Sequence, residues 1–239
     1  MEFTGFCPQG LDLLVENQMM DSPAFYEAHK AQIKELAIRP FYDLCETIKA
    51  DMVAIDSAFV VTPARMVSRV RRDTRYTKDK TLYRANLWIY FRRPRVRFED
   101  VPFYYMEIGP EFWRYGCWGG FGRGEMEQAR RLIAREDVRF QAAYQAVQGI
   151  EEMELAGALY KRPKCPQAAA PYQPWLNRKQ LGVDFTETED FAPAFDGSFV
   201  PKMIERFHRL KPFYDFLCTI REQAKNERGE CGEICRNGL

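Results

Sequence analysis

The hydrophobic pattern of this chain changes its period between the first sixty residues and the middle of the sequence, and this change restricts the fold more than any other feature. In the first sixty residues, apolar side chains recur every three or four positions, as on a helix that faces a core. Between residues 87 and 108 they alternate along the chain, as in β-strands. Helical segments followed by a group of strands are typical of an α+β fold.

Three helices are predicted before the strands. The first contains Leu11 and Leu14, and the second begins at Ser22, whose side chain can cap a helix with proline in its first turn. The third restarts after Arg39 and Pro40. It carries an apolar stripe that we expect to face the core, formed by Phe41, Leu44, Cys45, Ile48, Met52 and Ile55.

Four strands are predicted in the middle of the chain. Alternation places two of them at residues 87–92 and 103–108, and two further segments, Arg65–Arg71 and Phe112–Cys117, have similar patterns. The short connection at residues 109–110 favours a hairpin. Because short connections join antiparallel strands, we expect a central, mainly antiparallel sheet flanked by N-terminal and C-terminal helices.

A glycine-dense turn, Gly116–Gly124, precedes another predicted helix, and a further helix lies near Asp137–Val147. Glycines before a helix can present free backbone N–H groups to an anion. No Gly-Lys-Ser/Thr follows here, so turn geometry is the better interpretation. We expect no cofactor.

The C-terminal part contains a proline-rich, extended connection over Gly157–Gly182 and then an amphipathic helix from about Val200 to Lys225. Pro212 is expected to kink this helix. We therefore predict a single α+β domain over residues 1–225 and a polar C-terminal tail over residues 226–239.

The densest charge lies in Arg69–Arg84, which holds seven cations and two carboxylates in sixteen residues. Arginine offers a fixed fork of donors, and Thr and Tyr add hydroxyls, so this motif can coordinate a phosphate or carboxylate. The residues that we assign to ligand binding are Arg69, Arg72, Asp73, Arg75, Thr77, Lys78, Asp79, Lys80, Tyr83, Arg84, Lys161 and Arg162.

The arginine-rich motif Arg69–Arg84 resembles the signature of domain-of-unknown-function family 2461, a bacterial and fungal group. Phe25-Tyr26 with Lys30, the glycine turn Gly116–Gly119 and the segment Leu159–Pro163 resemble further motifs of this family. Together the resemblance covers most of residues 1–220. It implies an α+β fold and no established activity.

The chain departs from the family pattern at three places. Leu82 stands where proline is usual, Tyr76-Thr77 replaces Phe-Ser, and the turn Trp118–Phe121 is rich in aromatic residues. These changes preserve the placement of charges and hydroxyls, although Leu82 loosens the turn before Tyr83.

Two interpretations of the arginine-rich motif remain open. In the functional one, its cations line a concave site above the sheet, oriented by Asp73 and Asp79. In the structural one, the two aspartates pair with arginines, and a salt-bridged belt ties the sheet to the region of Lys161 and Arg162. Unpaired cations that cluster in a cleft would invite an anion, whereas paired cations would not.

Glu107 is the candidate catalytic residue, because it shares a predicted strand face with Phe103 and Tyr105. A carboxylate beside aromatic rings can have a raised pKa and act as a general base. The alternative is an ion pair with an arginine of a neighbouring strand, such as Arg92 or Arg114. Whether the protein is an enzyme stays open.

Composition excludes several classes of protein. Of 239 residues, 35 are Lys or Arg and 34 are Asp or Glu, so the net charge of +1 provides no bulk attraction to nucleic acid or anionic membranes. No apolar run approaches the roughly 20 residues that span a bilayer, and no signal peptide is evident. We therefore expect a cytoplasmic protein without a membrane partner.

The seven cysteines are odd in number and mostly isolated, which favours reduced thiols. Cys231 and Cys235 form a pair, but no second pair or nearby histidine completes a zinc set, so no metal site is predicted. His29 and His208 are the only histidines, which makes a histidine-based triad improbable.

Three functions follow from the sequence. The first is binding of a small anionic ligand through the arginine-rich motif, with or without catalysis. The second, disfavoured by the net charge, is nucleic-acid binding through the same cations with aromatic stacking. The third is a noncatalytic interaction module in which the motif is a structural network. The ligand, the oligomeric state and other partners do not follow from the sequence.

Overall fold

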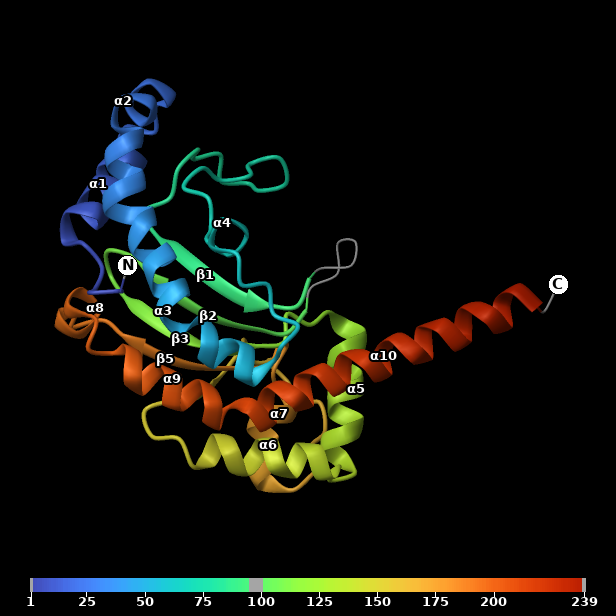
Figure 1. Cartoon of the computed structure of the whole chain (residues 1–239). Coiled ribbons are helices and arrows are strands. Elements are labelled where there is room, and N and C mark those ends of the chain that lie inside the picture. Colours follow the sequence, from blue (N-terminus) through green and yellow to red (C-terminus); the bar gives the residue numbers. More distant parts are fainter. Residues whose placement is uncertain (1, 95–100, 238–239) are drawn as a thin grey trace. The chain divides into compact units, whose positions relative to one another are not determined.

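The computed structural model describes residues 2–94 and 101–237, with side chains as far as residue 226 (Figure 1). The helices are α1 (Pro8–Met20), α2 (Pro23–Ile33), the π-helical η1 (Lys34–Ile38), α3 (Arg39–Ile55), α4 (Pro63–Met66), α5 (Arg123–Ala134), α6 (Val138–Gln148), the 3-10 turn η2 (Ala170–Tyr172), α7 (Gln173–Leu176), α8 (Ala192–Asp196), α9 (Val200–Arg209) and α10 (Lys211–Asn237). The strands are β1 (Leu87–Arg92), β2 (Phe103–Ile108), β3 (Trp113–Trp118), β4 (Glu154–Ala156) and β5 (Gly182–Glu187).

The strands form an antiparallel sheet in the order β1-β2-β3-β5-β4, which confirms the predicted α+β class. The chain divides into two compact units, each composed of three segments. The first unit contains residues 1–92, 104–115 and 186–205, and the second contains residues 93–103, 116–185 and 206–239. The single domain over residues 1–225 stays a prediction.

The apolar stripe predicted for the third helix forms the core of the first unit. All six of its residues are buried on α3, and α3 packs against β1 (Figure 1). The Ser22 hydroxyl accepts a hydrogen bond from the Phe25 N–H at 3.4 Å, which confirms the predicted cap of α2. The π-helical turn η1 joins α2 to α3, and a widened turn there accommodates Pro40, which has no N–H to donate.

The structure corrects the strand predicted at Arg65–Arg71. Pro63 begins the short helix α4 instead, and only isolated bridges follow, between Val67 and Ile89 and between Arg71 and Tyr83. Proline fits the first turn of a helix and cannot donate to a strand ladder, which explains why the alternating pattern there did not produce a strand. The other three predicted strands lie within one residue of β1, β2 and β3.

The core of the second unit is formed by α10, which packs against α5 and α6. Aromatic rings fill it: Phe140 lies 5.4 Å from Trp175 and 5.7 Å from Phe216 between ring centroids. Trp175 is buried on α7, so the connection predicted as extended over Gly157–Gly182 packs through short helices. In the same unit β4 pairs with β5, with Leu155 opposite Val183.

The structure also corrects the single kinked helix predicted from Val200 to Lys225. The helix α9 ends at Arg209 and α10 begins at Lys211, so Pro212 occupies a first turn, where a backbone N–H is not needed. The backbone of α10 continues through most of the predicted polar tail. Cys231 and Cys235 lie outside the residues whose side chains the structure describes.

None of the helices in the described part of the chain is long and apolar enough to cross a lipid bilayer.

Asp137 precedes α6 and combines a helix cap with two ion pairs. Its carboxylate accepts hydrogen bonds from the Arg139 backbone N–H at 3.1 Å and from the Arg139 Nε at 2.9 Å, and it lies 3.2 Å from the Arg135 guanidinium. The hydrogen bond from the Arg139 side chain is the main reason why the pKa of Asp137 falls from 3.8 to about 2.

We expect the stabilisation by the Asp137 charge to disappear in acid. A depressed pKa means that the folded state binds the proton less readily, so the contribution is complete above pH 3.8 and is lost as the pH falls towards about 2. In urea unfolding, Asp137→Asn should be less stable than wild type at pH 6, and the two proteins should converge near pH 2. A difference that persists unchanged in acid would contradict this account.

Candidate anion-binding site

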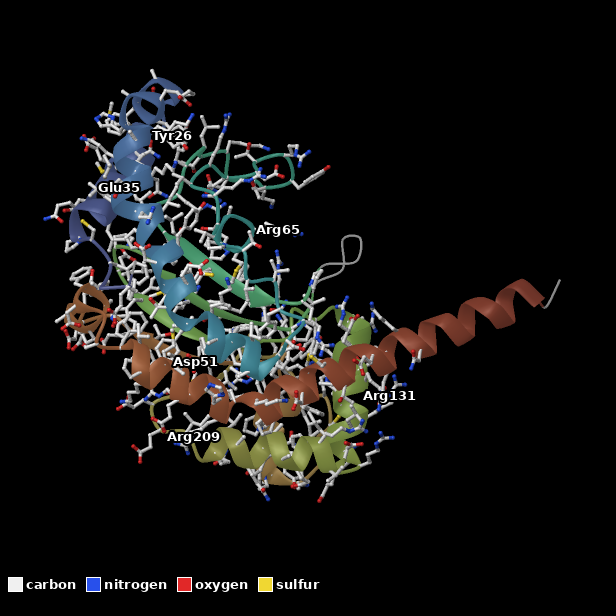
Figure 2. All side chains as sticks on the ribbon, in the orientation of Figure 1. Tyr26, Glu35, Asp51, Arg65, Arg131 and Arg209 are labelled. Atoms are coloured by element: carbon white, nitrogen blue, oxygen red, sulfur yellow. The ribbon has the colours of Figure 1, made fainter. Side chains whose placement is uncertain are left out.

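The second half of the arginine-rich motif is anchored by Asp21. This residue ends α1 in the left-handed conformation (φ 42°), and its Oδ1 accepts hydrogen bonds from the backbone N–H groups of Leu82 at 2.7 Å and Tyr83 at 3.2 Å. The buried Tyr83 ring stacks on Tyr26 with 5.1 Å between centroids. Tyr26 itself lies on α2 (Figure 2). Burial raises the pKa of Tyr83. The anchor was not predicted, because the motif contains no signal for a distant carboxylate.

The tip of the motif neutralises part of its own charge. Asp73 accepts hydrogen bonds from Arg75 Nε at 2.9 Å and Nη2 at 2.7 Å, and Arg72 Nη1 lies 2.6 Å from Asp79. The Arg75 hydrogen bonds lower the pKa of Asp73 to about 2. These are the internal pairs expected in the structural interpretation of the motif.

Hydroxyl and backbone groups complete the tip. Asp79 also accepts from the hydroxyl and the N–H of Thr81, and these are the main reason why the pKa of Asp79 is lowered. The Thr77 hydroxyl donates to the Asp79 carbonyl at 2.7 Å, and the Lys80 ammonium donates to the Thr74 carbonyl at 2.8 Å. The predicted ligand residues at the tip therefore mainly hold the loop together.

Arg84 differs from these residues, because its guanidinium has no hydrogen bond or ion pair within the described chain. Its Cζ lies 4.4 Å from the centroid of the Trp88 ring, and its Nε is buried without an acceptor. Desolvation is the main cause of its lowered pKa, and the charge of Arg72 adds to it. Arg69 and Lys78, which are exposed, likewise have no ion pair among the described residues.

The carboxylate of Glu107 is occupied by neighbouring side chains. It accepts from Asn86 Nδ2 at 2.5 Å and from Arg114, whose Nε lies at 2.8 Å and whose Nη2 lies at 2.6 Å. The buried Glu107 thus makes the cross-strand ion pair that was the alternative to catalysis. Its role as a general base stays a prediction.

Lys161 and Arg162 belong to the second unit, whereas the whole of Arg69–Arg84 belongs to the first. Both side chains are exposed. That Lys161 and Arg162 bind the same ligand as the motif stays a prediction, since their spacing in the sequence does not establish that they lie near it.

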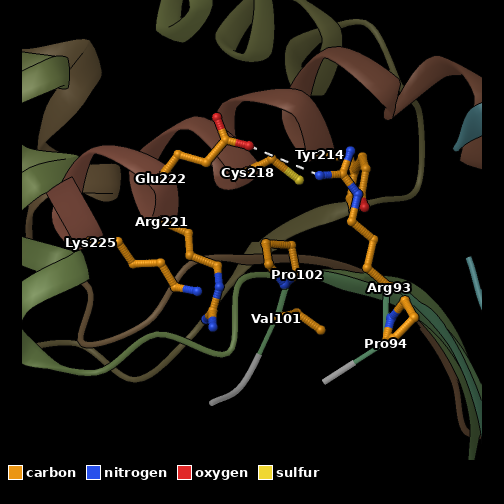
Figure 3. Close-up of a pocket in the computed structure, with 9 residues that line it drawn as sticks. All are labelled: Arg93, Pro94, Val101, Pro102, Tyr214, Cys218, Arg221, Glu222 and Lys225. Carbon is orange, nitrogen blue, oxygen red and sulfur yellow. Dashed lines mark ion pairs between the residues drawn. The ribbon is translucent and has the colours of Figure 1, made fainter. Parts of the chain in front are cut away.

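Among the cavities lined by described residues, two lie within single units. The one in the second unit, of about 190 Å³, lies beside α10 and contains the Cys218 thiol (Figure 3). Arg93 and Glu222 form an ion pair of 4.0 Å at its edge (Figure 3). The smaller cavity, in the first unit, is lined by apolar side chains of α1, α3 and their neighbours. Neither of these two cavities is lined by a residue of Arg69–Arg84.

Fold and motif together define an α+β protein with a basic loop before the first strand of an antiparallel sheet. The model of a family described as "Conserved hypothetical protein (DUF2461)" matches residues 9–216. The chain belongs to this family, which confirms the resemblance found in the sequence. A comparison with curated proteins found no match.

We expect Asp21 to hold the arginine-rich motif in place. Asp21→Gly should lower the unfolding free energy by about 1–3 kcal/mol, because two backbone donors lose their acceptor while glycine accepts the positive φ without strain. Asp21→Asn retains an acceptor oxygen and should lose much less. Urea unfolding and hydrogen exchange of the Leu82 and Tyr83 amides measure both effects. Equal losses of stability in the two variants would show that the side-chain oxygen of residue 21 does not account for the stabilisation.

Proposed function

We propose that this protein binds a small anionic ligand, bearing phosphate or carboxylate groups, at the Arg84 end of the arginine-rich motif. The observation that carries this proposal is the half-buried Arg84 guanidinium, which makes no ion pair or hydrogen bond with the described residues. A desolvated cation without a partner is costly to the folded protein, and a bound anion would remove that cost.

The geometry around Arg84 favours recognition of an oxyanion. One face of the guanidinium lies against the Trp88 ring, and Nε is the only one of its nitrogens that is buried without a partner. The two terminal nitrogens are therefore left to meet a ligand, and their fork matches two oxygens of a phosphate or carboxylate. Arg72 contributes positive potential nearby, as its effect on the pKa of Arg84 indicates.

One acidic residue, Glu107, influences the pKa of Arg84 but does not cancel this preference. Glu107 favours the charged form of Arg84, but its carboxylate accepts its hydrogen bonds from Asn86 and Arg114. Arg84 therefore has a carboxylate in its neighbourhood and no carboxylate in contact. Arg84 is therefore a better candidate for ligand binding than Arg72 and Arg75, which already form ion pairs at the tip.

Replacement of Arg84 tests this proposal. In calorimetric titrations with inorganic phosphate and with citrate, we expect wild type to bind and Arg84→Met to bind at least about tenfold more weakly, the value of one charged hydrogen bond. Arg84→Lys keeps the charge without the fork and should be intermediate. The control is Arg75→Gln, which removes an equal charge that is already paired with Asp73 and should bind like wild type.

A stability measurement separates this proposal from the structural interpretation. Because Arg84 has no internal partner, Arg84→Met should change the unfolding free energy by less than about 1 kcal/mol, the value of its contact with Trp88. If Arg84 itself belonged to a structural network, this variant would instead lose several kcal/mol of stability. The proposal fails if wild type binds neither anion, or if Arg75→Gln weakens binding as much as Arg84→Met.

We also propose that the protein is cytoplasmic. The cysteines for which the structure describes a free thiol are Cys7, Cys45, Cys117, Cys165 and Cys218. Free thiols are typical of a reducing compartment. Fractionation of cells that express the tagged protein tests this location, and recovery of most of the protein outside the cytoplasmic fraction would contradict it.

A further inference from the structure

A second group of cations surrounds Tyr160 in the second unit. Measured to the centroid of its ring, Lys164 Nζ lies at 4.4 Å, Arg130 Cζ at 5.3 Å and Lys179 Nζ at 5.7 Å. The two ammonium groups can therefore be no more than about 10 Å apart. This separation does not exceed the Debye length of about 10 Å at 0.1 M salt, so their repulsion is only partly screened.

Backbone hydrogen bonds place these cations. The Tyr160 N–H donates to the carbonyl of Asn177 at 2.8 Å, and the Lys179 N–H donates to the carbonyl of Ala158 at 2.7 Å. The Lys164 N–H donates to the Asn177 side-chain oxygen at 2.8 Å. The two chain segments that carry Lys164 and Lys179 are thus joined directly, and the proximity of the two charges follows from the fold.

Arg130 supports this cluster from within. Its guanidinium is almost completely buried, donates to the carbonyls of Leu176 at 3.0 Å and Arg178 at 2.9 Å, and lies 3.1 Å from a carboxylate oxygen of Glu127. Its charge and its donors are satisfied by the protein. Arg130 is therefore a structural member of the cluster.

The exposed cations of the cluster are not neutralised in this way. Within the described chain, the side chains of Lys164 and Lys179 form no ion pair and no hydrogen bond. The same is true of the side chains of Lys161 and Arg162, which lie in the same connection. Each of these four side chains is exposed. Contact with the Tyr160 ring offsets part of the repulsion, since cation–π contacts at exposed sites contribute about 0.5–1 kcal/mol. The surplus positive charge remains.

We infer that the exposed cations of this cluster, Lys164 and Lys179, together with Lys161 and Arg162, which follow Tyr160 in the chain, bind the phosphodiester backbone of a nucleic acid. Small metabolites are usually held in concave sites, whereas these cations are all exposed. Successive phosphates of one chain can each neutralise one such cation and release counterions. The attraction is local, because the net charge of the whole chain is only +1.

The inference goes beyond the proposed function and does not depend on it. The arginine-rich motif contributes no residue to the Tyr160 cluster. An Arg84→Met protein should therefore bind nucleic acid like wild type, even if it has lost phosphate binding.

Fluorescence anisotropy with labelled oligonucleotides tests the inference. The test variant is Lys164→Gln/Lys179→Gln. The control is Lys30→Gln/Lys49→Gln, which removes the same charge from lysines already paired with Glu27 and Glu46. A mixed-sequence single-stranded RNA and a duplex DNA of equal length serve as probes, and each is titrated at several salt concentrations.

We expect the test variant to bind at least about tenfold more weakly than wild type at 0.1 M salt. Its slope of log K against log salt should be shallower by about 1.4 for the single strand, or about 1.8 for the duplex, because two phosphate contacts are lost. The probe that shows this change identifies the kind of nucleic acid. The control should match wild type in affinity and slope.

Three results would overturn the inference. The first is that wild type binds neither probe. The second is that the control loses as much affinity as the test variant. The third is that a poly-glutamate peptide or anionic lipid vesicles bind in a manner that depends on Lys164 and Lys179, while the oligonucleotides do not. Thermal melting followed by circular dichroism confirms that each variant is folded, as expected for exposed lysines.

Discussion

The carboxylate of Asp21 holds the second half of the arginine-rich motif to the end of α1, and the position of Arg84 depends on this contact. By accepting two backbone N–H groups, Asp21 fixes Leu82 and Tyr83. The buried ring of Tyr83 then ties this end of the motif to α2. Arg84 is the next residue in the chain, and its guanidinium lies over the Trp88 ring. A single acceptor at the end of α1 therefore decides where a charged side chain 63 residues later can lie.

The same electrostatic rule distinguishes structural from functional cations in both units. Where a carboxylate or carbonyl is in contact, as for Arg75 and Arg130, the charge is satisfied and the side chain supports the fold. Where the fold brings cations near one another or away from water without a partner, as for Arg84 and Lys164, the protein carries a surplus that an external anion can neutralise. Charge density in the sequence does not separate these two cases.

Much of the fold was predictable from periodicity. A helix that buries one face, or a strand that buries alternate positions, has apolar residues at a regular spacing in the sequence. The stripe on α3 and the hairpin of β2 and β3 are examples. The failures occur where one residue outweighs the pattern. Pro63 converted a predicted strand into a helical turn, and Pro212 separated two helices. The strands β4 and β5 were missed, since β4 has only three residues and β5 contains only two apolar side chains, Val183 and Phe185.

For the candidate sites, the sequence determined which chemistry is available: arginine forks, lysine ammonium groups and hydroxyls in known segments, and membership of a family matched over residues 9–216. Only the tertiary structure decided which cations are paired. Ion pairing and desolvation depend on distances between atoms, and residues distant in the chain set those distances, as Asp21 does for Arg84 and Asn177 does for Lys164. Composition and spacing contain no such distances, so the selection of Arg84 and of the Tyr160 cluster required the fold.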